Sequence, residues 1–272
     1  MLQKLVDFSK LSSVRIGAEV PLNYIESPLD YEELRQQTTP QIIGKANNLL
    51  VSPQAQNLCA LGKVFDYIKD LGDCLEVGAA TPSGKLFSYA KRHNLSGFEI
   101  LAGLPGSLGG IIKMNAGLKE YEIKSVLLGI LQLDSESRLD FRAVESLELG
   151  YRSSGISGMI FAGIFKKQVG FRRGLVESFV KMRQNQPKEP SFGSCFKNPK
   201  GDFAGRLIEQ VGLKGAKFGK NKSLCFSPKH ANFLVNLGDS SFEEALELIA
   251  LAEEKVQQEC GIALEREVQI VY

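Results

Sequence analysis

Histidine and cysteine, which build most metal sites and disulfide scaffolds, are scarce in this sequence. His93 and His230 are the only histidines, so a histidine-based metal site is not expected. The five cysteines are odd in number and include no Cys-x-x-Cys pair, so neither a disulfide scaffold nor a zinc ribbon fits. These counts predict reduced thiols, no bound metal and a cytoplasmic protein.

Long apolar runs and a strong net charge are missing as well. No stretch approaches the roughly eighteen uninterrupted apolar residues of a membrane-spanning helix, so membrane insertion is not expected. Residues 1–8 lack the basic patch, apolar stretch and small-residue cleavage site of a signal peptide. The formal net charge of +2 argues against a generally basic nucleic-acid-binding protein and against a nucleic-acid partner.

The 272 residues are enough for one large domain or two modest ones. In the first 170 residues, short apolar runs are bounded by glycine or proline, a pattern typical of buried strands. A helix is expected over 83–94, because Leu86, Tyr89 and Ala90 share one stripe after Pro82. Strands mixed with few helices predict an α+β fold. The expected strands lie within 41–44, 48–51, 74–78, 125–133 and 159–165.

Residues 171–190 differ in character from the residues before them. They read as a polar helix followed by a connector that prolines punctuate, so we place a domain boundary there. Beyond this boundary we expect helices packed on a small sheet. The expected elements are a helix over 203–211 that Gly212 closes, a strand over 231–236, a long helix that opens with a capping box at Ser240-Ser-Phe-Glu-Glu and ends at Gly261, and a final strand over 264–271.

Positive charge is concentrated in residues 181–230. This segment holds eleven lysines and arginines against three acidic residues, so the rest of the chain is net negative. It can be a solvated lysine-rich face, an electropositive funnel for a phosphorylated small molecule, or an RNA-binding face. The last option is disfavoured because we expect none of the interleaved exposed aromatics that base stacking needs. Charge alone leaves the first two open.

The densest signal for function is the glycine-rich segment 101–117. Its glycines leave the main chain bare, and successive exposed N–H groups can form a nest for phosphate oxygens. Neither the P-loop nor the Rossmann spacing is present. Five glycines within fifteen residues favour a ligand-cradling loop over a simple tight turn: Gly103, Gly106, Gly109, Gly110 and Gly117. A second segment, 44–50, is on its own more typical of a turn between strands.

Several motifs, in order along the chain, resemble those of the UDP-N-acetylenolpyruvoylglucosamine reductase family. The residues Gly103-Leu-Pro-Gly-Ser-Leu-Gly-Gly, followed by Met114-Asn-Ala-Gly, resemble its flavin-diphosphate loop. Tyr151-Arg-Ser-Ser resembles its Tyr-Arg-x-Ser motif, and the segment from Pro190 to Pro199 resembles its Gly-Ser-x-Phe-Lys-Asn-Pro motif. Segments 201–209, 227–233 and 264–270 complete the set. The resemblance covers residues 12–271 and is closest to the shorter class of the family.

The resemblance implies both a fold and a reaction. Residues 1–170 would form a two-lobed FAD-binding unit of the vanillyl-alcohol-oxidase (PCMH) type, split near residue 70. Residues 171–190 would be a connector and 191–272 an α+β substrate-binding domain. The chain would be a monomeric, cytoplasmic oxidoreductase that uses FAD and NADPH to reduce the enolpyruvyl ether of a UDP-sugar to UDP-N-acetylmuramate for peptidoglycan. The alternatives are another small-molecule flavin oxidoreductase of the same fold and a non-enzymatic nucleotide- or RNA-binding module.

Three residues match the catalytic positions of the family. Arg152, a planar cation that stays protonated, would stabilise the enolate-like carboxylate of the intermediate. Ser194 would donate a proton to the α-carbon, and Glu267 would stabilise the intermediate through a hydrogen bond if protonated. Without the resemblance, these residues are typical of a surface salt bridge, a turn hydroxyl and an exposed strand carboxylate.

The resemblance also assigns binding residues. Ala46 stands where the family has a second glycine, and we expect its methyl group to narrow the approach of a phosphate while FAD still binds. Cys195 has no base paired with it in the sequence and is interpreted as a small packing residue. The cofactor-binding set is Gly44, Asn47, Asn48, Leu49, Gly103, Pro105, Gly106, Ser107, Gly109, Gly110, Asn115, Ala116 and Gly117. The substrate-binding set is Tyr151, Arg152, Lys197, Asn198, Lys229, His230 and Asn232.

Overall fold

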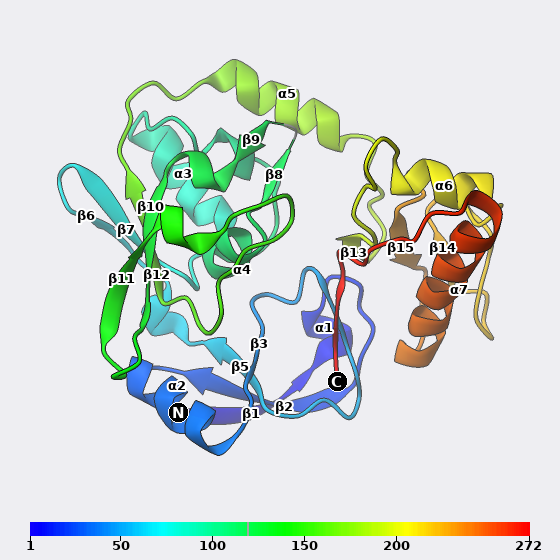
Figure 1. Ribbon diagram of the computed structural model, residues 1–272, viewed down its shortest axis with the longest axis horizontal. Coiled ribbons are helices and arrows are strands. Elements are labelled where there is room, and N and C mark those ends of the chain that lie inside the picture. The colour runs from blue at the N-terminus through cyan, green and yellow to red at the C-terminus, as the bar shows by residue number, and fades with distance from the viewer. Residues whose placement is uncertain (119) are drawn as a thin grey trace. The chain divides into compact units, whose positions relative to one another are not determined.

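The computed structural model describes residues 1–118 and 120–272, and the chain divides into two compact units (Figure 1). The main division follows Gln184, inside the expected connector over 171–190. The assignment of a FAD-binding unit to 1–170 and of a substrate-binding domain to 191–272 stays a prediction. The first unit comprises Met1–Lys4, Leu22–Lys45 and Asn57–Gln184; the second comprises Leu5–Pro21, Ala46–Gln56 and Asn185–Tyr272.

A four-stranded sheet lies near the N-terminus, with the strand order β1-β2-β5-β3. The central strand β5 runs parallel to both β2 and β3. The helix α2 (Pro28–Gln37) follows β2 and begins with a capping box between Ser27 and Asp30. The strands are β1 (Leu2–Asp7), β2 (Glu19–Ile25), β3 (Gln41–Ile42) and β5 (Leu58–Leu61), and the boundaries between the two units fall within β1 and β2.

The second sheet of the first unit has five strands in the order β11-β10-β12-β7-β6, and all neighbours are antiparallel. Its core contains the buried side chains of Leu75, Val77, Ile130 and Phe165. The strands are β6 (Ile68–Asp70), β7 (Cys74–Gly78), β10 (Leu127–Leu133), β11 (Leu139–Ala143) and β12 (Ala162–Lys166); around them lie α3 (Ser83–Arg92), α4 (Leu108–Lys113), α5 (Arg173–Arg183) and the short hairpin of β8 (Gly117–Leu118) and β9 (Tyr121–Glu122).

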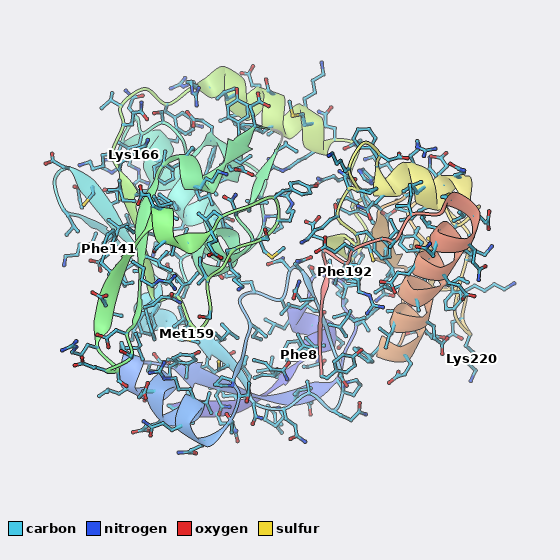
Figure 2. The ribbon with its side chains drawn as sticks, viewed as in Figure 1. Phe8, Phe141, Met159, Lys166, Phe192 and Lys220 are labelled. Carbon is cyan, nitrogen blue, oxygen red and sulfur yellow. The ribbon has the colours of Figure 1, made fainter. Side chains whose placement is uncertain are left out.

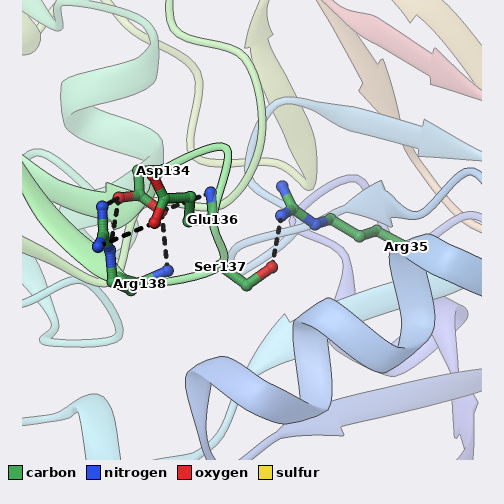
Figure 3. Close-up of polar contacts among 5 residues, drawn as sticks. All are labelled: Arg35, Asp134, Glu136, Ser137 and Arg138. Atoms are coloured by element: carbon green, nitrogen blue, oxygen red, sulfur yellow. Dashed lines mark hydrogen bonds and ion pairs between the residues drawn. The ribbon is translucent and has the colours of Figure 1, made fainter.

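The turn between β10 and β11 connects this sheet to α2 (Figure 3). Asp134 closes the turn, because its Oδ1 accepts the N–H groups of Glu136 at 2.8 Å and Arg138 at 2.9 Å. Ser137 has a left-handed φ of 62° in this turn. Its hydroxyl accepts a hydrogen bond from Nη2 of Arg35, which lies on α2, at 3.4 Å. Residues a hundred positions apart are therefore joined within the first unit.

The second unit is built on the three-stranded antiparallel sheet β13-β15-β14. The long helix α7 (Phe242–Cys260) begins with a capping box between Ser241 and Glu244 and ends at Gly261, whose φ is 70°. The fully buried Phe192, labelled in Figure 2, belongs to its core. The other elements are β13 (Ser191–Ser194), α6 (Ala204–Gln210), β14 (Leu224–Phe226), β15 (Phe233–Asn236), α1 (Phe8–Leu11) and the parallel pair of β4 (Leu49–Val51) with β16 (Gln269–Val271).

Most elements expected from the sequence are confirmed, but the final strand is not continuous. Only Gln269–Val271 forms a strand, preceded by an isolated bridge between Arg266 and Phe196. The N–H groups of Glu267 and Val268 both point to the carbonyl oxygen of Cys195, at 2.8 and 3.2 Å. The chain bends at that shared acceptor and changes partner, from the segment after β13 to β4. A local alternation of side chains cannot reveal such a change.

Other features bear on the kind of protein. All five cysteines are free thiols. Within residues 1–118 and 120–272, no cluster of histidine, cysteine and carboxylate side chains has a composition that could hold a metal ion. None of the helices described over these residues combines the length and the apolar character needed to cross a bilayer.

Candidate active site

A cavity of about 310 Å³ in the second unit contains most of the residues predicted to bind the substrate. It lies where β13, the start of α6 and the turn before β15 meet. Five predicted site residues line it: Ser194, Asn198, Lys229, His230 and Asn232. The remaining lining residues are Phe203, Gly205, Arg206, Glu209, Lys214 and Ala231. The cavity therefore combines amide, ammonium and hydroxyl groups suited to a phosphorylated ligand.

Ser194 ends β13 and lies opposite Phe233 of β15. The preceding residue, Gly193, has a φ of 87°, which a residue with a side chain rarely adopts. The register of β13 shifts between Ser191 and Ser194, so the strand is irregular here. The Ser194 side chain is half-buried, and within the described part of the chain its hydroxyl makes no hydrogen bond. The hydroxyl is thus held at the cavity wall without a protein partner.

Asn232 holds the segment that follows Ser194. Its side chain, 3% exposed, accepts the N–H of Phe196 at 3.0 Å and donates to the carbonyl of the same residue at 2.7 Å. Its own carbonyl accepts the N–H of Cys195 at 2.7 Å. Both functions of the amide are therefore engaged with the main chain. Asn232 lines the cavity, but the contacts of its amide position the segment.

Cys195 is fully buried in the hydrophobic core, as its interpretation as a packing residue requires. Burial raises the pKa of its thiol well above the usual value. A thiol that resists ionisation is a poor nucleophile. Cys195 therefore contributes packing and a main-chain acceptor, although it is adjacent to Ser194.

The segment 265–267 pairs with the residues after Ser194. Besides the bond from Glu267 to Cys195, the N–H of Lys197 donates to the carbonyl of Glu265 at 2.8 Å. Glu267 is half-buried and lies before β16 rather than on the polar face of a strand. Its carbonyl accepts a hydrogen bond from Nδ2 of Asn48 at 2.9 Å. The structure thus brings a predicted catalytic residue and a predicted cofactor-binding residue together.

Lys197, also predicted to bind the substrate, does not line the cavity. Its ammonium group is 2.7 Å from the carboxylate of Glu265. Lys229, in contrast, lines the cavity, and its side chain forms no ion pair among the described residues. Lys214 also lines the cavity, but its ammonium group is paired with the carboxylate of Glu209 at 2.8 Å. Lys229 is therefore the cation most available to a ligand.

The surroundings of His230 favour the neutral form of its imidazole. Its Nδ1 accepts the N–H of Asn232 at 3.4 Å, and its ring packs edge-on against Phe233. Burial lowers the pKa of the imidazole below its usual value of 6.5, and the positive charge of Lys214 acts in the same direction. His230 can therefore offer its second ring nitrogen to a ligand as a neutral hydrogen-bond donor.

The glycine-rich segment belongs to the first unit, includes α4 and ends at Gly117, the first residue of β8. Gly103 and Gly106 have φ values of 70° and 121°, a backbone conformation that residues with a side chain rarely adopt, so glycine is needed at both positions. Ser83, at the start of α3, fixes the segment through hydrogen bonds to the carbonyls of Leu104 and Gly106. Within the described residues, the N–H groups of Gly103, Gly106, Ser107 and Gly110 donate to no acceptor. Such a set of unused donors is suited to an anion.

Other predicted cofactor residues of the first unit lie around this segment. A Cβ atom on Gly44 would approach Oγ of Ser107 to 3.0 Å, so the two loops are in contact. Asn115 is fully buried and donates from Nδ2 to the carbonyl of Gly150 at 3.0 Å, while its Oδ1 has no partner. A Cβ on Gly117 would meet the carbonyl oxygen of Tyr121 at 2.5 Å, which explains this glycine by close packing.

The second unit holds the other part of the predicted cofactor set. Oδ1 of Asn47 is buried without a partner, as Oδ1 of Asn115 is. Ala46 is buried and has a φ of 48°, a conformation that favours glycine. The N–H groups of Ala46, Asn47 and Asn48 donate to no acceptor among the described residues. In the second unit, one buried oxygen and several main-chain donors are thus left for a ligand.

Arg152 and Tyr151 belong to the first unit. Arg152 has a left-handed φ of 53° and donates from Nη2 to the carbonyl of Gly117 at 2.9 Å, which places it beside the end of the glycine-rich segment. Its guanidinium lies 5.5 Å from the ring centre of Tyr151, which is 52% exposed. Arg183 binds the carbonyls of Ile100 and Ala102 in front of Gly103. Burial lowers the pKa of Arg183, and the charge of Arg152 adds to this effect.

Comparisons with known proteins decide the family. Residues 185–271 match the family described as UDP-N-acetylenolpyruvoylglucosamine reductase, C-terminal domain. The reductase of that name from Helicobacter hepaticus is 52% identical, with all of both chains covered. The chain belongs to the UDP-N-acetylenolpyruvoylglucosamine reductase family. The relative of that name from Campylobacter jejuni strain RM1221 is 43% identical over 98% of this chain and 100% of its own.

The resemblance found in the sequence is therefore confirmed, and the chain is an oxidoreductase. A crystal structure of UDP-N-acetylenolpyruvylglucosamine reductase (MurB) from Thermus caldophilus superposes with a TM-score of 0.85 at 30% identity and covers 100% of both chains. This likeness confirms the α+β fold of the reductase family.

One exposed aromatic residue of the basic segment 181–230 has no place in the expectations from the sequence. Phe203 is 67% exposed and lines the cavity. From the sequence, Phe203 is expected only as the first residue of the helix over 203–211. The available signal was its position outside the buried stripe of α6, which is formed by Ala204, Leu207, Ile208 and Val211.

Proposed function

We propose that the chain reduces UDP-N-acetylenolpyruvoylglucosamine to UDP-N-acetylmuramate, with NADPH as reductant and FAD as cofactor, in the synthesis of peptidoglycan precursors. The observation that carries this proposal is the 52% identity, along the full length of both chains, to a reductase named for this substrate. The cavity beside Ser194 supports it, because its cationic and amide groups suit a nucleoside-diphosphate sugar.

The residues present fit a bound FAD in a two-lobed unit of the vanillyl-alcohol-oxidase type. Within the first unit, the unused N–H groups of the glycine-rich segment and the unpaired oxygen of Asn115 are groups that a diphosphate and its sugars would satisfy. The chemistry that the flavin supplies when bound is hydride transfer from N5 after its reduction by NADPH. The residues proposed to hold it are Gly44, Asn47, Asn48, Leu49, Gly103, Pro105, Gly106, Ser107, Gly109, Gly110, Asn115, Ala116 and Gly117.

The chain's own residues perform the acid and electrostatic steps in this proposal. Ser194 gives its hydroxyl proton to the α-carbon, and its unpartnered hydroxyl at the cavity wall is suited to that role. Arg152 stabilises the negative charge that develops on the substrate carboxylate. Glu267 would donate a hydrogen bond to the intermediate if it is protonated. Serine is a weak acid, so its alkoxide must be compensated by neighbouring positive charge and reprotonated by a relay.

Substrate binding is assigned to residues around the same cavity. Lys229 and Asn198 provide an ammonium and an amide for the diphosphate, and His230 provides a neutral donor. Lys197 contributes positive charge near the cavity while bound to Glu265. The net charge of the 181–230 segment then attracts anionic substrates, which corresponds to the funnel rather than to an inert lysine-rich face.

A spectroscopic titration tests the function. The purified protein is expected to be yellow, to lose its flavin absorbance when NADPH is added anaerobically, and to regain it when the enolpyruvyl substrate follows. A protein that NADPH bleaches but this substrate fails to reoxidise is another flavin oxidoreductase. A colourless protein that cannot be reconstituted with FAD, and binds oligonucleotides with strong salt dependence, contradicts the proposal altogether.

A further inference from the structure

The phenyl ring of Phe203 lines the cavity and has no role in the reaction steps above. It is 67% exposed, and the only other exposed phenylalanine in the described ranges is Phe141, on β11 of the first unit (Figure 2). An exposed ring leaves its apolar surface in water, which is unfavourable by itself. The packing of α6 does not require it, because the core-facing residues of that helix come after it.

The main chain that carries Phe203 is fixed on both sides. Its N–H donates to Oδ1 of Asp202 at 2.7 Å, and the N–H of Ala204 donates to Oδ1 of Asn198 at 3.1 Å. Asp202 is itself held by Arg206, one turn further on, and these contacts lower the pKa of its carboxyl to about 2. A ring displayed on a preorganised segment loses little freedom when it binds a ligand.

The neighbours of Phe203 do not form a docking surface for another protein. Arg206 and Lys214 line the same cavity as the ring, and Lys200 and Gly201 precede Phe203 along the chain. An apolar interface would need a continuous patch, whereas here a single ring stands among charged and polar groups. A lone aromatic face beside cationic groups matches a ligand with one aromatic ring and several negative charges.

We propose that the uracil base of the nucleotide substrate stacks on Phe203. This inference rests on the proposed function, which supplies a uridine-diphosphate sugar. The cavity then matches both ends of the nucleotide, since Lys229 and Asn198 face the charged diphosphate and Phe203 offers an apolar π face for the base. Stacking of one base on an aromatic side chain contributes roughly five- to a hundredfold in affinity.

The binding of UDP to the flavin-loaded enzyme, measured by calorimetry, tests the proposal. Phe203→Ala is expected to weaken UDP binding about tenfold and to raise the KM of the enolpyruvyl substrate similarly, with kcat nearly unchanged. Phe203→Tyr and Phe203→Trp retain a π face and are expected to bind as the wild type does. Phe203→Leu retains apolar surface without a π face, so it is expected to behave like the alanine variant.

A second probe removes the aromaticity from the ligand instead of the protein. Uridine diphosphate with a saturated, non-planar 5,6-dihydrouracil ring is expected to bind the wild type about tenfold more weakly than UDP, while Phe203→Ala binds both ligands equally. The matched control is Phe141→Ala, which removes the other exposed phenylalanine and leaves both affinities unchanged. Thermal melting of each variant separates a lost contact from a lost fold.

The outcomes distinguish the stacking proposal from the proposed function. Unchanged UDP affinity in Phe203→Ala and Phe203→Leu, or equal losses for UDP and its dihydro analogue, overturns stacking even if the enzyme turns over its substrate. A wild type that reduces no enolpyruvyl substrate, yet binds UDP in a manner that depends on Phe203, contradicts the function and leaves stacking supported.

Discussion

The glycine-rich segment of the first unit and the Ser194 segment of the second build their sites from different parts of the chain. The first offers main-chain N–H groups at Gly103, Gly106 and Gly110, whose side chains are absent. The second offers a hydroxyl, an amide and an ammonium group at the wall of a cavity. A main-chain site depends on conformation and on empty space, whereas a side-chain site depends on the identity of a few residues.

Both segments are nevertheless held in the same way, by a polar side chain that binds main-chain groups. Arg183 donates to the carbonyls of Ile100 and Ala102 before the glycines. Asn232 bonds both polar groups of Phe196 after Ser194. In each unit the positioning residue is remote in sequence from the segment that it fixes. Because the first site uses main-chain N–H groups and the second uses side chains, substitution of a site residue should affect the two sites differently.

The largest effect is expected from Ser194→Ala, because the side-chain site then loses its proposed proton donor. Reoxidation of the reduced enzyme by substrate should slow by several orders of magnitude, while reduction by NADPH continues at the wild-type rate. Stopped-flow absorbance measures the two half-reactions separately. Ser178→Ala, which removes an exposed hydroxyl from α5, is the control and should leave both intact. Equal damage to both half-reactions would make Ser194 a structural residue.

The next effect concerns the residue that positions the side-chain site. Asn232→Ala leaves the N–H and the carbonyl of Phe196 without their buried partner, which should reduce the free energy of unfolding by about 2–4 kcal/mol. Urea denaturation measures the change. The exposed Asn221 serves as a comparison, since Asn221→Ala should cost about 0.5 kcal/mol or less. A loss of substrate affinity without destabilisation would instead support a direct contact between Asn232 and the ligand.

A substitution in the main-chain site is expected to have a smaller effect on the free energy of unfolding, and to raise it rather than lower it. Gly110 is exposed on α4, and a Cβ added there would have nothing within 4 Å, so Gly110→Ala should stabilise the flavin-free protein by about 0.5–1 kcal/mol through helix propensity. The same methyl group should lower the affinity for FAD if the cofactor approaches the bare main chain of this segment, because a side chain then stands between them.

The matched control for this variant is Gly84→Ala. Gly84 is also exposed in a helix with nothing within 4 Å of a Cβ, and it has no part in the proposed cofactor site. It should give the same stabilisation in thermal melting and no change in flavin content. Tight FAD binding by Gly110→Ala would remove Gly110 from the cofactor site.

The smallest effect is a dependence of stability on pH that arises from His230. Burial lowers the pKa of this imidazole in the folded state below 6.5, so the unfolded chain takes up the proton more readily. Stability should therefore fall as the pH drops below 6.5 and be unaffected by this group above that value. His230→Gln should flatten this decline between about pH 7.5 and 5.5 in urea midpoints. An unchanged slope would show that His230 is not the group responsible.

Much of the fold could be predicted because its signals are local. The helix over 240–260 and its capping box, and the strand of 74–78, depend on residues that are neighbours in the chain. The last strand was misjudged because Glu267 and Val268 share an acceptor, Cys195, that is about seventy residues away. The left-handed conformation of Ala46 was equally hidden, because alanine gives no local sign of it.

The candidate site residues likewise divide into those that local sequence signals predict and those that depend on distant contacts. Motif order identified the family and predicts the glycine-rich segment and Ser194 as site residues, since residue types and their spacing can be read from the chain. The sequence could not predict that the amide of Asn232 bonds to Phe196 or that Lys197 pairs with Glu265 outside the cavity lining. It also could not predict that the ring of Phe203 is exposed there. Those outcomes depend on which distant groups are close enough to bond and which surfaces remain uncovered, and only tertiary packing decides both.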